Sequence, residues 1–159
     1  KIDNLFVIKD CNDSNNTCKM LKFSFKKKVK LIPQIFLIED SKTFLQTLKL
    51  KLKTVFKDAA TVRGYTESKT FLDELQEAPA VVIMDYYLDS ESDVEGIELL
   101  KEIRFRAPKS FILVLTGEED LDVAKKCFKL GANSYMVKSF DTLDEIVEEI
   151  HYKVNLSNI

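Results

Sequence analysis

Several residue types that build common classes of site are scarce in this 159-residue sequence. It has no Trp, a single His at position 151, and three Cys at positions 11, 18 and 127. An odd number of Cys at this spacing is not typical of a metal site, and His151 has no Cys or His close to it in the sequence. We therefore expect reduced thiols and a cytoplasmic location, with a Cys11–Cys18 disulfide as the alternative.

Long hydrophobic runs are also missing. No apolar stretch approaches the roughly 20 residues that a membrane-spanning helix needs. The opening residues, KIDNLFVIKDCNDSNN, lack the apolar core and the small-residue cleavage site of a signal peptide. We predict that the chain neither crosses nor binds a membrane, and its 45% hydrophobic composition is sufficient for one well-packed core.

Charge is nearly balanced overall, at −2, but it is unevenly distributed. Residues 1–33 contain eight Lys and three Asp, so they carry +5 and the remaining residues carry −7. The acidic part is a poor ligand for nucleic acid and the basic part is short. We expect no direct binding to nucleic acid.

Residues from Pro33 onward alternate between strand-like and helix-like segments. The strand-like runs are QIFLIED (34–40), TVRGY (61–65), AVVIMD (80–85), FILVLTG (111–117) and SYMVKSF (134–140). Nearly continuous apolar strands alternating with helices indicate a parallel sheet that is covered on both faces. We predict an α/β fold with a doubly wound, five-stranded parallel sheet of the flavodoxin-like order 2-1-3-4-5.

Apolar residues at helical spacing mark the expected buried faces of the helices. In the first helix they are Phe44, Leu45, Leu48, Leu52 and Val55, and in the fourth they are Val123, Ala124, Cys127 and Phe128.

Residues 1–33 do not belong to this alternation. Two strand-capable stretches, NLFVIKD and MLKFSFKKKVKLI, are separated by the turn-rich CNDSNNTC. We predict a basic N-terminal extension over residues 1–33 and a separate domain over residues 34–159. The extension forms either a β-hairpin or a partly ordered segment, and its lysines at 26, 27, 28 and 30 either contact an acidic partner or line a solvated edge.

Polar residues end four of the five strand-like runs. Glu39 and Asp40 end the first, Asp85 the third, Thr116 the fourth and Lys138 the fifth. Ligands of open α/β sheets bind beyond the carboxyl ends of the strands, where the strand order reverses. In the predicted order the first and third strands are neighbours, so we expect the three acids to converge, with Thr116 and Lys138 on the same side.

Such a cluster suits phosphoryl chemistry. Three carboxylates raise each other's pKa values unless a cation lies between them, and oxygen ligands suit Mg²⁺. A hydroxyl group and an ammonium group are suited to binding an anion, and Asp85 is well placed to accept a phosphoryl group. Taken singly, each of these residues is more often a solvated loop residue or a helix cap, and the joint placement favours a site.

Four stretches resemble the receiver domain of two-component response regulators: FLIEDS, VVIMDYYL, ILVLTG and GANSYMVKSF. The resemblance covers roughly residues 33–155. It implies that Asp85 is the phospho-acceptor, and that Glu39, Asp40 and Asp85 bind Mg²⁺ together with the backbone carbonyl of Tyr87. It further implies that Thr116 is a switch hydroxyl, Lys138 a phosphate-contacting lysine, and Tyr135 an aromatic switch residue.

The sequence departs from the receiver pattern at three places. Ser139 follows Lys138 where receivers usually have a proline, often after a cis bond, so we expect either a strained bond or a trans bond here. Glu39 replaces the more common Asp. The stretch from Asp85 to Gly96 is longer than usual, acidic, and without proline. Tyr87 and Glu118 flank the expected path of attacking water, so we expect them to tune dephosphorylation.

The resemblance implies a phospho-acceptor signalling domain and not an enzyme. It would take its phosphoryl group from a histidine kinase or a phosphotransfer protein and signal to an unidentified protein, and homodimerisation stays open. One alternative is a pseudo-receiver that is never phosphorylated. Another is a haloacid-dehalogenase-like phosphatase, although that family has its nucleophile in a D-x-D pattern on the first strand and residues 39–41 read E-D-S.

Overall fold

The computed structural model describes residues 5–12, 17–24, 32–88, 93–117, 119–139 and 141–156. The chain divides into two compact units, Lys1–Leu31 and Ile32–Ile159. In the first unit, β1 (Leu5–Asn12) pairs antiparallel with β2 (Thr17–Ser24), which is the pairing that the predicted hairpin requires. Cys11 lies opposite Cys18 in this register.

The second unit contains a five-stranded parallel sheet in the order β4-β3-β5-β6-β7. Its strands are β3 (Gln34–Ile38), β4 (Thr61–Tyr65), β5 (Val81–Asp85), β6 (Phe111–Thr116) and β7 (Ser134–Val137). Numbered within the sheet, this is the order 2-1-3-4-5. The predicted doubly wound α/β fold is confirmed.

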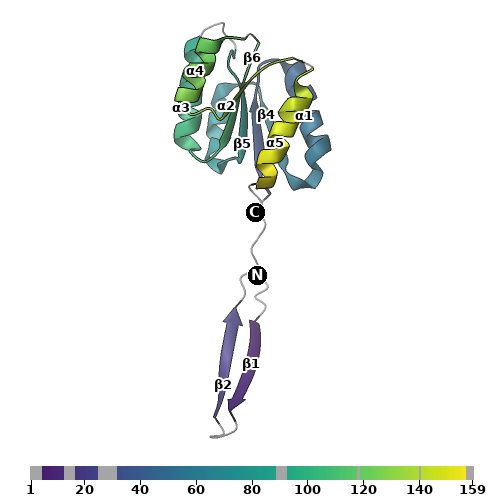
Figure 1. Ribbon diagram of the computed structural model, residues 1–159, viewed down its shortest axis with the longest axis vertical. Helices are drawn as coiled ribbons and strands as arrows, with labels where there is room; N and C mark the ends of the chain where they lie inside the picture. Colours follow the sequence, from purple (N-terminus) through teal and green to yellow (C-terminus); the bar gives the residue numbers. More distant parts are fainter. Residues whose placement is uncertain are drawn as a thin grey trace. The chain divides into compact units, whose positions relative to one another are not determined.

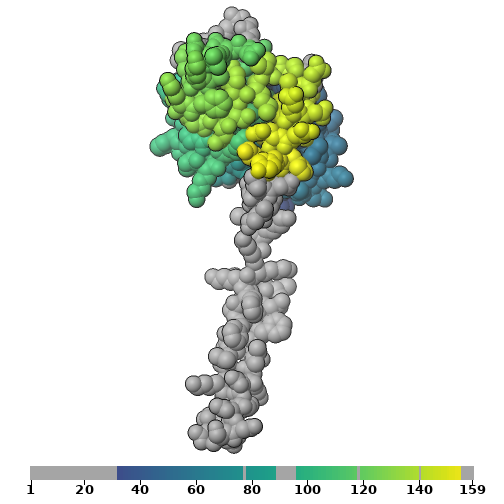
Figure 2. All heavy atoms as spheres, in the orientation of Figure 1, coloured from purple at the N-terminus to yellow at the C-terminus, as the bar shows by residue number. Residues whose placement is uncertain are grey.

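Five α-helices alternate with these strands. They are α1 (Lys42–Phe56), α2 (Ser68–Glu74), α3 (Asp93–Arg106), α4 (Leu121–Lys129) and α5 (Leu143–Leu156), with short 3-10 turns η1 (Lys57–Ala59) and η2 (Leu75–Glu77). Helices α1 and α5 cover one face of the sheet, and α2, α3 and α4 cover the other (Figure 1). Figure 2 shows the outer surface that α4, in green, and α5, in yellow, form on one side of this unit.

Each face of the sheet has its own apolar core, because successive strand residues point to opposite faces. Ile35 and Leu37 pack with α1 and α5, whereas Phe36 and Ile38 pack with α2, α3 and α4. All five residues of β5 are buried. Among the described residues, no helix is long and apolar enough to cross a membrane.

Two of the predicted helix-face residues are in fact exposed. Val55 is 43% exposed, and the next residue, Phe56, is buried instead at the end of α1. Phe128 is 51% exposed on α4, while Val123 and Cys127 are buried. Successive residues of a helix are about 100° apart around its axis. A residue at the edge of the apolar stripe can therefore lie either on the buried face or on the exposed face of the helix.

The third helix begins earlier than Gly96, where the helical pattern was predicted to begin. It begins at Asp93, and Gly96 lies in its first turn directly against the backbone carbonyl of Tyr86. A Cβ at position 96 would collide with that carbonyl oxygen. The absence of a side chain therefore lets α3 pass close to the segment that follows Asp85.

Candidate functional site

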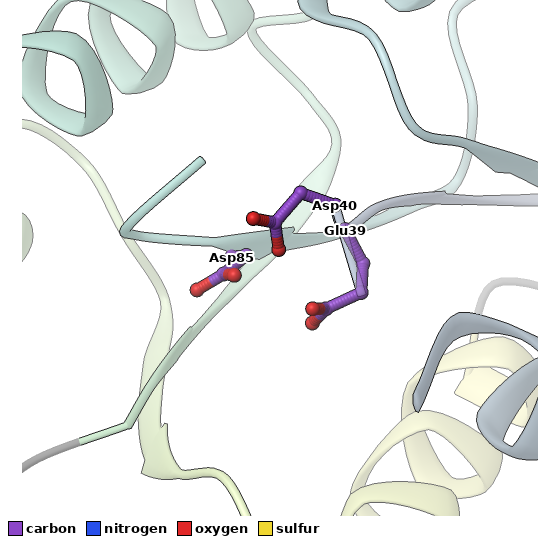
Figure 3. Close-up of side chains that lie close together, drawn as sticks. All are labelled: Glu39, Asp40 and Asp85. Carbon is purple, nitrogen blue, oxygen red and sulfur yellow. The ribbon is translucent and has the colours of Figure 1, made fainter. Parts of the chain in front are cut away.

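The two central strands of the sheet end in acidic residues. Glu39 and Asp40 follow β3, and Asp85 is the last residue of the neighbouring strand β5. Strand order reverses between β3 and β5, which is the place where open α/β sheets bind ligands. Each of the three acids has a carboxylate oxygen within 4.8 Å of one from each of the others (Figure 3).

Glu39 is held by the backbone around it. Its amide donates to the carbonyl of Tyr65 on β4 (3.0 Å), and its Oε1 accepts from the amide of Ser41 (3.1 Å). Ser41 is the N-cap of α1, where its hydroxyl accepts the amide of Phe44 (3.4 Å). The start of the helix therefore fixes the direction in which Glu39 enters the site.

Lys138 joins two of the acids. Its Nζ donates to Oδ2 of Asp85 at 2.6 Å and to both carboxylate oxygens of Glu39 at 3.2 Å. Its backbone amide donates to the carbonyl of Thr116 (2.6 Å), and its ammonium lies 5.6 Å from the ring centroid of Phe44. Phe44 was anticipated only as a core residue, because a helical apolar pattern carries no signal of a neighbour so far away in the sequence.

Burial dominates the electrostatics of this cluster. Glu39 is 3% exposed and Asp85 1% exposed. Burial, followed by the nearby charge of Asp85, raises the pKa of Glu39 to about 7 despite the opposing effect of Lys138. Burial also raises the pKa of Asp85, against the hydrogen bond and the charge of Lys138. The sequence led us to expect mutual repulsion as the cause, but loss of water is the larger one.

The ammonium group responds in the opposite sense. Burial by itself would lower the pKa of Lys138, but the hydrogen bond and negative charge of Asp85, together with those of Glu39, raise it above its ordinary value. Lys138 therefore stays charged while it faces a cluster that contains more acids than bases.

A second group of side chains extends from the site to α4. Thr116 ends β6 and is 1% exposed, and its side chain shares a hydrogen bond with that of Tyr135 on β7. The Tyr135 hydroxyl also donates to the carbonyl of Asp120 (3.5 Å). Asp120 caps α4 by accepting the amides of Asp122 and Val123. Thr116 is thus connected through Tyr135 to the first turn of α4.

The residues after Asp85 lie close to its carboxylate. The amide of Tyr87 donates to Oδ1 of Asp85 (3.2 Å), and the rings of Tyr86 and Tyr87 meet edge to face at 4.9 Å. The role of the Tyr87 carbonyl as a metal ligand stays a prediction. Glu118 and the loop residues 89–92 lie outside the described residues.

The bond between Lys138 and Ser139 is trans, since the described residues contain no cis peptide bond. Ser139 instead takes part in a reciprocal arrangement with Thr142. The amide of Ser139 donates to the Thr142 hydroxyl, and the amide of Thr142 donates to the Ser139 hydroxyl, both at 3.0 Å. The Thr142 hydroxyl also donates to the carbonyl of Val137. Of the two outcomes expected at Ser139, the structure has the trans bond, and these polar contacts order the connection to α5.

The donors present fit a hard divalent cation. The cluster offers three carboxylates and no sulfur or imidazole ligand among the described residues, and such oxygen-only sets suit Mg²⁺ or Ca²⁺. Burial raises the pKa values of Glu39 and Asp85, so a cation bound between them would favour their charged forms. The Glu39–Asp40–Asp85 cluster could therefore bind a metal ion.

Comparison with curated proteins agrees with this geometry. The chain is 30% identical over 128 residues to the cell cycle transcriptional regulator CtrA of Caulobacter vibrioides, a match that covers 78% of this chain and 51% of CtrA. It is 33% identical over 94 residues to the DNA-binding transcriptional regulator NtrC of Escherichia coli K12, covering 59% of this chain and 18% of NtrC. The chain therefore spans about half the length of CtrA and less of NtrC.

Solved structures share the fold of the second unit. A response regulator receiver protein from Pseudoalteromonas atlantica has a TM-score of 0.68 at 21% identity, covering 79% of this chain and 99% of that one. A response regulator from Thermotoga maritima has a TM-score of 0.64 at 25% identity, with coverage of 79% and 99%. The family model described as the response regulator receiver domain matches residues 35–151. With this match, this fold and this strand-end cluster, the chain belongs to the response regulator receiver family of two-component systems.

Proposed function

We propose that Asp85 accepts a phosphoryl group from the phosphohistidine of a histidine kinase or a phosphotransfer protein, with Mg²⁺ bound beside it. Receiver domains interact with such proteins, and the family match covers most of the chain. The observation that carries the proposal is the buried Asp85 carboxylate with Glu39, Asp40 and Lys138 around it. Packing at the end of a strand does not require three acids and a lysine at one place.

In the proposed transfer, an Asp85 carboxylate oxygen attacks the phosphorus atom. A new P–O bond forms while the P–N bond to the donor imidazole breaks, and the imidazole leaves with the bonding electron pair. Asp85 must be ionised for this attack, and the short contact with the Lys138 ammonium favours its charged form.

The residues around Asp85 would balance the negative charge that the phosphoryl group adds. Glu39, Asp40, Asp85 and the carbonyl of Tyr87 would hold Mg²⁺, which when bound neutralises charge on the phosphoryl oxygens. Lys138 already lies 2.6 Å from the acceptor and is placed to contact the new oxygens.

We propose that phosphorylation signals through Thr116 and Tyr135. A phosphoryl oxygen is a stronger acceptor than a neutral hydroxyl, so it would draw the Thr116 hydroxyl away from Tyr135. Because Tyr135 also contacts the Asp120 carbonyl before α4, the change would reach the surface formed by α4 and β7. The output would then be contact with another protein, by a domain that is cytoplasmic and does not itself bind nucleic acid or a membrane.

The test is intact-mass measurement after incubation with Mg²⁺ and acetyl phosphate. A single phosphate adduct that disappears in Asp85→Asn is the expected result, and Asp40→Asn should slow its formation. Asp73→Asn, on the exposed part of α2, is the matched control and should be labelled normally. Absence of an adduct would support the pseudo-receiver instead, and steady release of phosphate would support the phosphatase.

The lifetime of the phosphoryl group provides a separate test of Tyr87. Its half-buried ring packs against Tyr86 beside the acceptor, so we propose that it shields the acyl phosphate from water. Tyr87→Ala should lose its phosphate faster than the parent protein, whereas Tyr87→Phe should resemble the parent. Equal lifetimes for all three would show that the ring does not shield the bond.

A further inference from the structure

The peptide groups on both sides of Lys138 are held by one side chain from outside the acidic cluster. The Thr142 hydroxyl donates to the carbonyl of Val137, the residue before Lys138, at 3.0 Å, with the carbonyl of Ser139 as a second acceptor at 3.1 Å. The same hydroxyl oxygen accepts from the amide of Ser139, the residue after Lys138, at 3.0 Å. One hydroxyl group therefore bridges the chain across Lys138.

A contact between strands holds the same stretch as well. The Lys138 amide donates to the carbonyl of Thr116 at 2.6 Å, so both polar groups of the peptide that joins Val137 to Lys138 are bonded. A peptide group is planar, and only two dihedral angles link it to the next one. Because the peptide groups on both sides are bonded, the direction in which the Lys138 side chain leaves the backbone is set.

The start of α5 does not account for all of these contacts. Ser139 and Thr142 exchange two bonds, from each amide to the other hydroxyl, which is the pattern of a capping box at the start of a helix. A capping box needs only those two bonds. The bond to the Val137 carbonyl is additional, because it reaches back past Lys138 to the last residue of β7. A proline at position 139 would have neither an amide hydrogen nor a hydroxyl for this arrangement.

Lys138 needs such support because its ammonium contacts two acids at once. Its Nζ lies 2.6 Å from Oδ2 of Asp85 and 3.2 Å from both carboxylate oxygens of Glu39. Lysine has a flexible four-carbon stem, so its ammonium is held at one point more firmly when the backbone end of the stem is fixed. The side chain is 18% exposed, which leaves water as a competing partner for an ammonium that moves away from the acids.

From this arrangement we propose that Thr142, assisted by Ser139, is a positioning residue for Lys138. It holds the ammonium where the phosphoryl oxygens arrive, and it acts through Lys138 without contacting the phosphoryl group. The proposal rests on the phosphoryl transfer to Asp85 proposed above, and it adds to that site two residues that lie outside the acidic cluster.

The first test removes the Thr142 hydroxyl and keeps the shape of the side chain. In Thr142→Val, intact-mass measurement should show that Mg²⁺ and acetyl phosphate label the full chain about tenfold more slowly, because small displacements of a reacting site slow a reaction strongly. Thr142→Ser retains the hydroxyl and should stay within about twofold of the parent rate. Thr54→Val is the matched control. Its exposed hydroxyl donates to the Leu50 carbonyl on α1 (2.9 Å), and its loss should leave the rate unchanged.

The second test asks whether Thr142 acts through Lys138. In a Lys138→Met background, Thr142→Val should slow phosphate addition no further, because the ammonium that it positions is absent. A purely structural residue would slow the reaction by the same factor in both backgrounds. Equal factors, or a parent-like rate in Thr142→Val alone, would overturn the proposal.

Urea unfolding without divalent cations gives a readout that needs no phosphorylation. Lys138→Met should destabilise Thr142→Val clearly less than it destabilises the parent, because a misplaced ammonium makes weaker contacts with Asp85 and Glu39. Additive losses would overturn the proposal. If the parent takes up no phosphate, the transfer to Asp85 fails as a function, and these unfolding measurements alone decide whether Thr142 positions Lys138.

Ser139→Ala takes the place of Thr142→Val if circular dichroism shows that the latter does not fold. It removes the hydroxyl that accepts from the Thr142 amide and leaves the Ser139 amide in place. Its effects on the labelling rate and on the comparison with Lys138→Met should be of the same kind and smaller. Strictly additive effects of this variant and Lys138→Met would count against the proposal in the same way.

Discussion

Two charged clusters lie on neighbouring strands of one sheet, and they are balanced differently. At the ends of β3 and β5, Glu39 and Asp85 both accept from the ammonium of Lys138, Asp40 lies close to them, and the Glu39 and Asp85 side chains are no more than 5% exposed. On β4 and α2, Glu74 accepts from Arg63 (3.0 Å) and from the Tyr65 hydroxyl (2.7 Å), with both charged side chains more than 40% exposed.

The difference separates an ordinary surface cluster from the candidate site. At the edge of the sheet, Glu74 and Arg63 pair one acid with one base among the contacts of the described residues, and such a largely exposed ion pair is of small energetic value. The Glu39 cluster keeps an excess of negative charge where water is largely excluded, which is costly unless a cation joins it. A buried charge imbalance therefore indicates a binding site more strongly than the number of charged residues does.

The largest expected effect is that of Lys138→Met, measured by urea unfolding at about pH 8 without divalent cations. Removing one partner from a buried ion pair costs about 3–5 kcal/mol. Because the Lys138 side chain retains 18% exposure, we expect a loss of about 2–3 kcal/mol. Arg63→Met, in the balanced cluster, should cost less than about 1 kcal/mol. Equal losses would remove the distinction between the two clusters.

The next effect is that of Glu39→Gln, and it depends on pH. The pKa of Glu39 rises from 4.5 to about 7 on folding, so the folded protein binds this proton more tightly than the unfolded chain does. The resulting loss of stability is absent below about pH 4.5, grows as pH rises, and is complete above about pH 7. Glutamine does not titrate and avoids this loss.

Relative to the parent protein, Glu39→Gln should therefore gain about 1–2 kcal/mol in free energy of unfolding between about pH 5 and pH 8. Urea midpoints of both proteins across this range, again without metal, give the difference directly. A difference that is constant with pH would mean that the folded protein does not raise this pKa.

Addition of Mg²⁺ should have a somewhat smaller effect. At ten times its dissociation constant, a ligand that binds only the folded state stabilises it by about 1.4 kcal/mol. Thermal unfolding at increasing Mg²⁺ concentration should show this for the parent protein and for Glu74→Gln, and less of it for Asp40→Asn and Asp85→Asn. Identical responses of all four proteins would place Mg²⁺ elsewhere.

The smallest effect is expected in the balanced cluster. Glu74→Gln removes the charge that pairs with Arg63 but keeps an acceptor for the Tyr65 hydroxyl. Because the pair is largely exposed, we expect a loss of only about 0.5–1 kcal/mol in urea unfolding. Its sign is opposite to that of Glu39→Gln above about pH 7, although both substitutions neutralise one glutamate. If both variants were stabilised, general charge repulsion would explain the results better than the local clusters do.

The helices show where sequence patterns are less informative. Val55 and Phe56 differ by one position, yet the first is exposed and the second is buried. The sequence pattern predicts a helix that starts at Gly96. In the structure, the lack of a side chain at Gly96 lets α3 lie close to the Tyr86 carbonyl. Both outcomes depend on how a helix is placed on the sheet, and side-chain periodicity does not specify that placement.

The alternation of strands and helices, and the acids, hydroxyl and lysine at the strand ends, could be predicted from the sequence, because hydrophobic period and turn chemistry are local properties of the chain. Folding was needed to bring Lys138 to Asp85, 53 positions away, and to Glu39, 99 positions away, with Phe44 beside it. It also decided that burial, more than repulsion between acids, sets their pKa values. Distances and solvent exclusion between residues remote in sequence arise from packing, and no short segment of the chain encodes them.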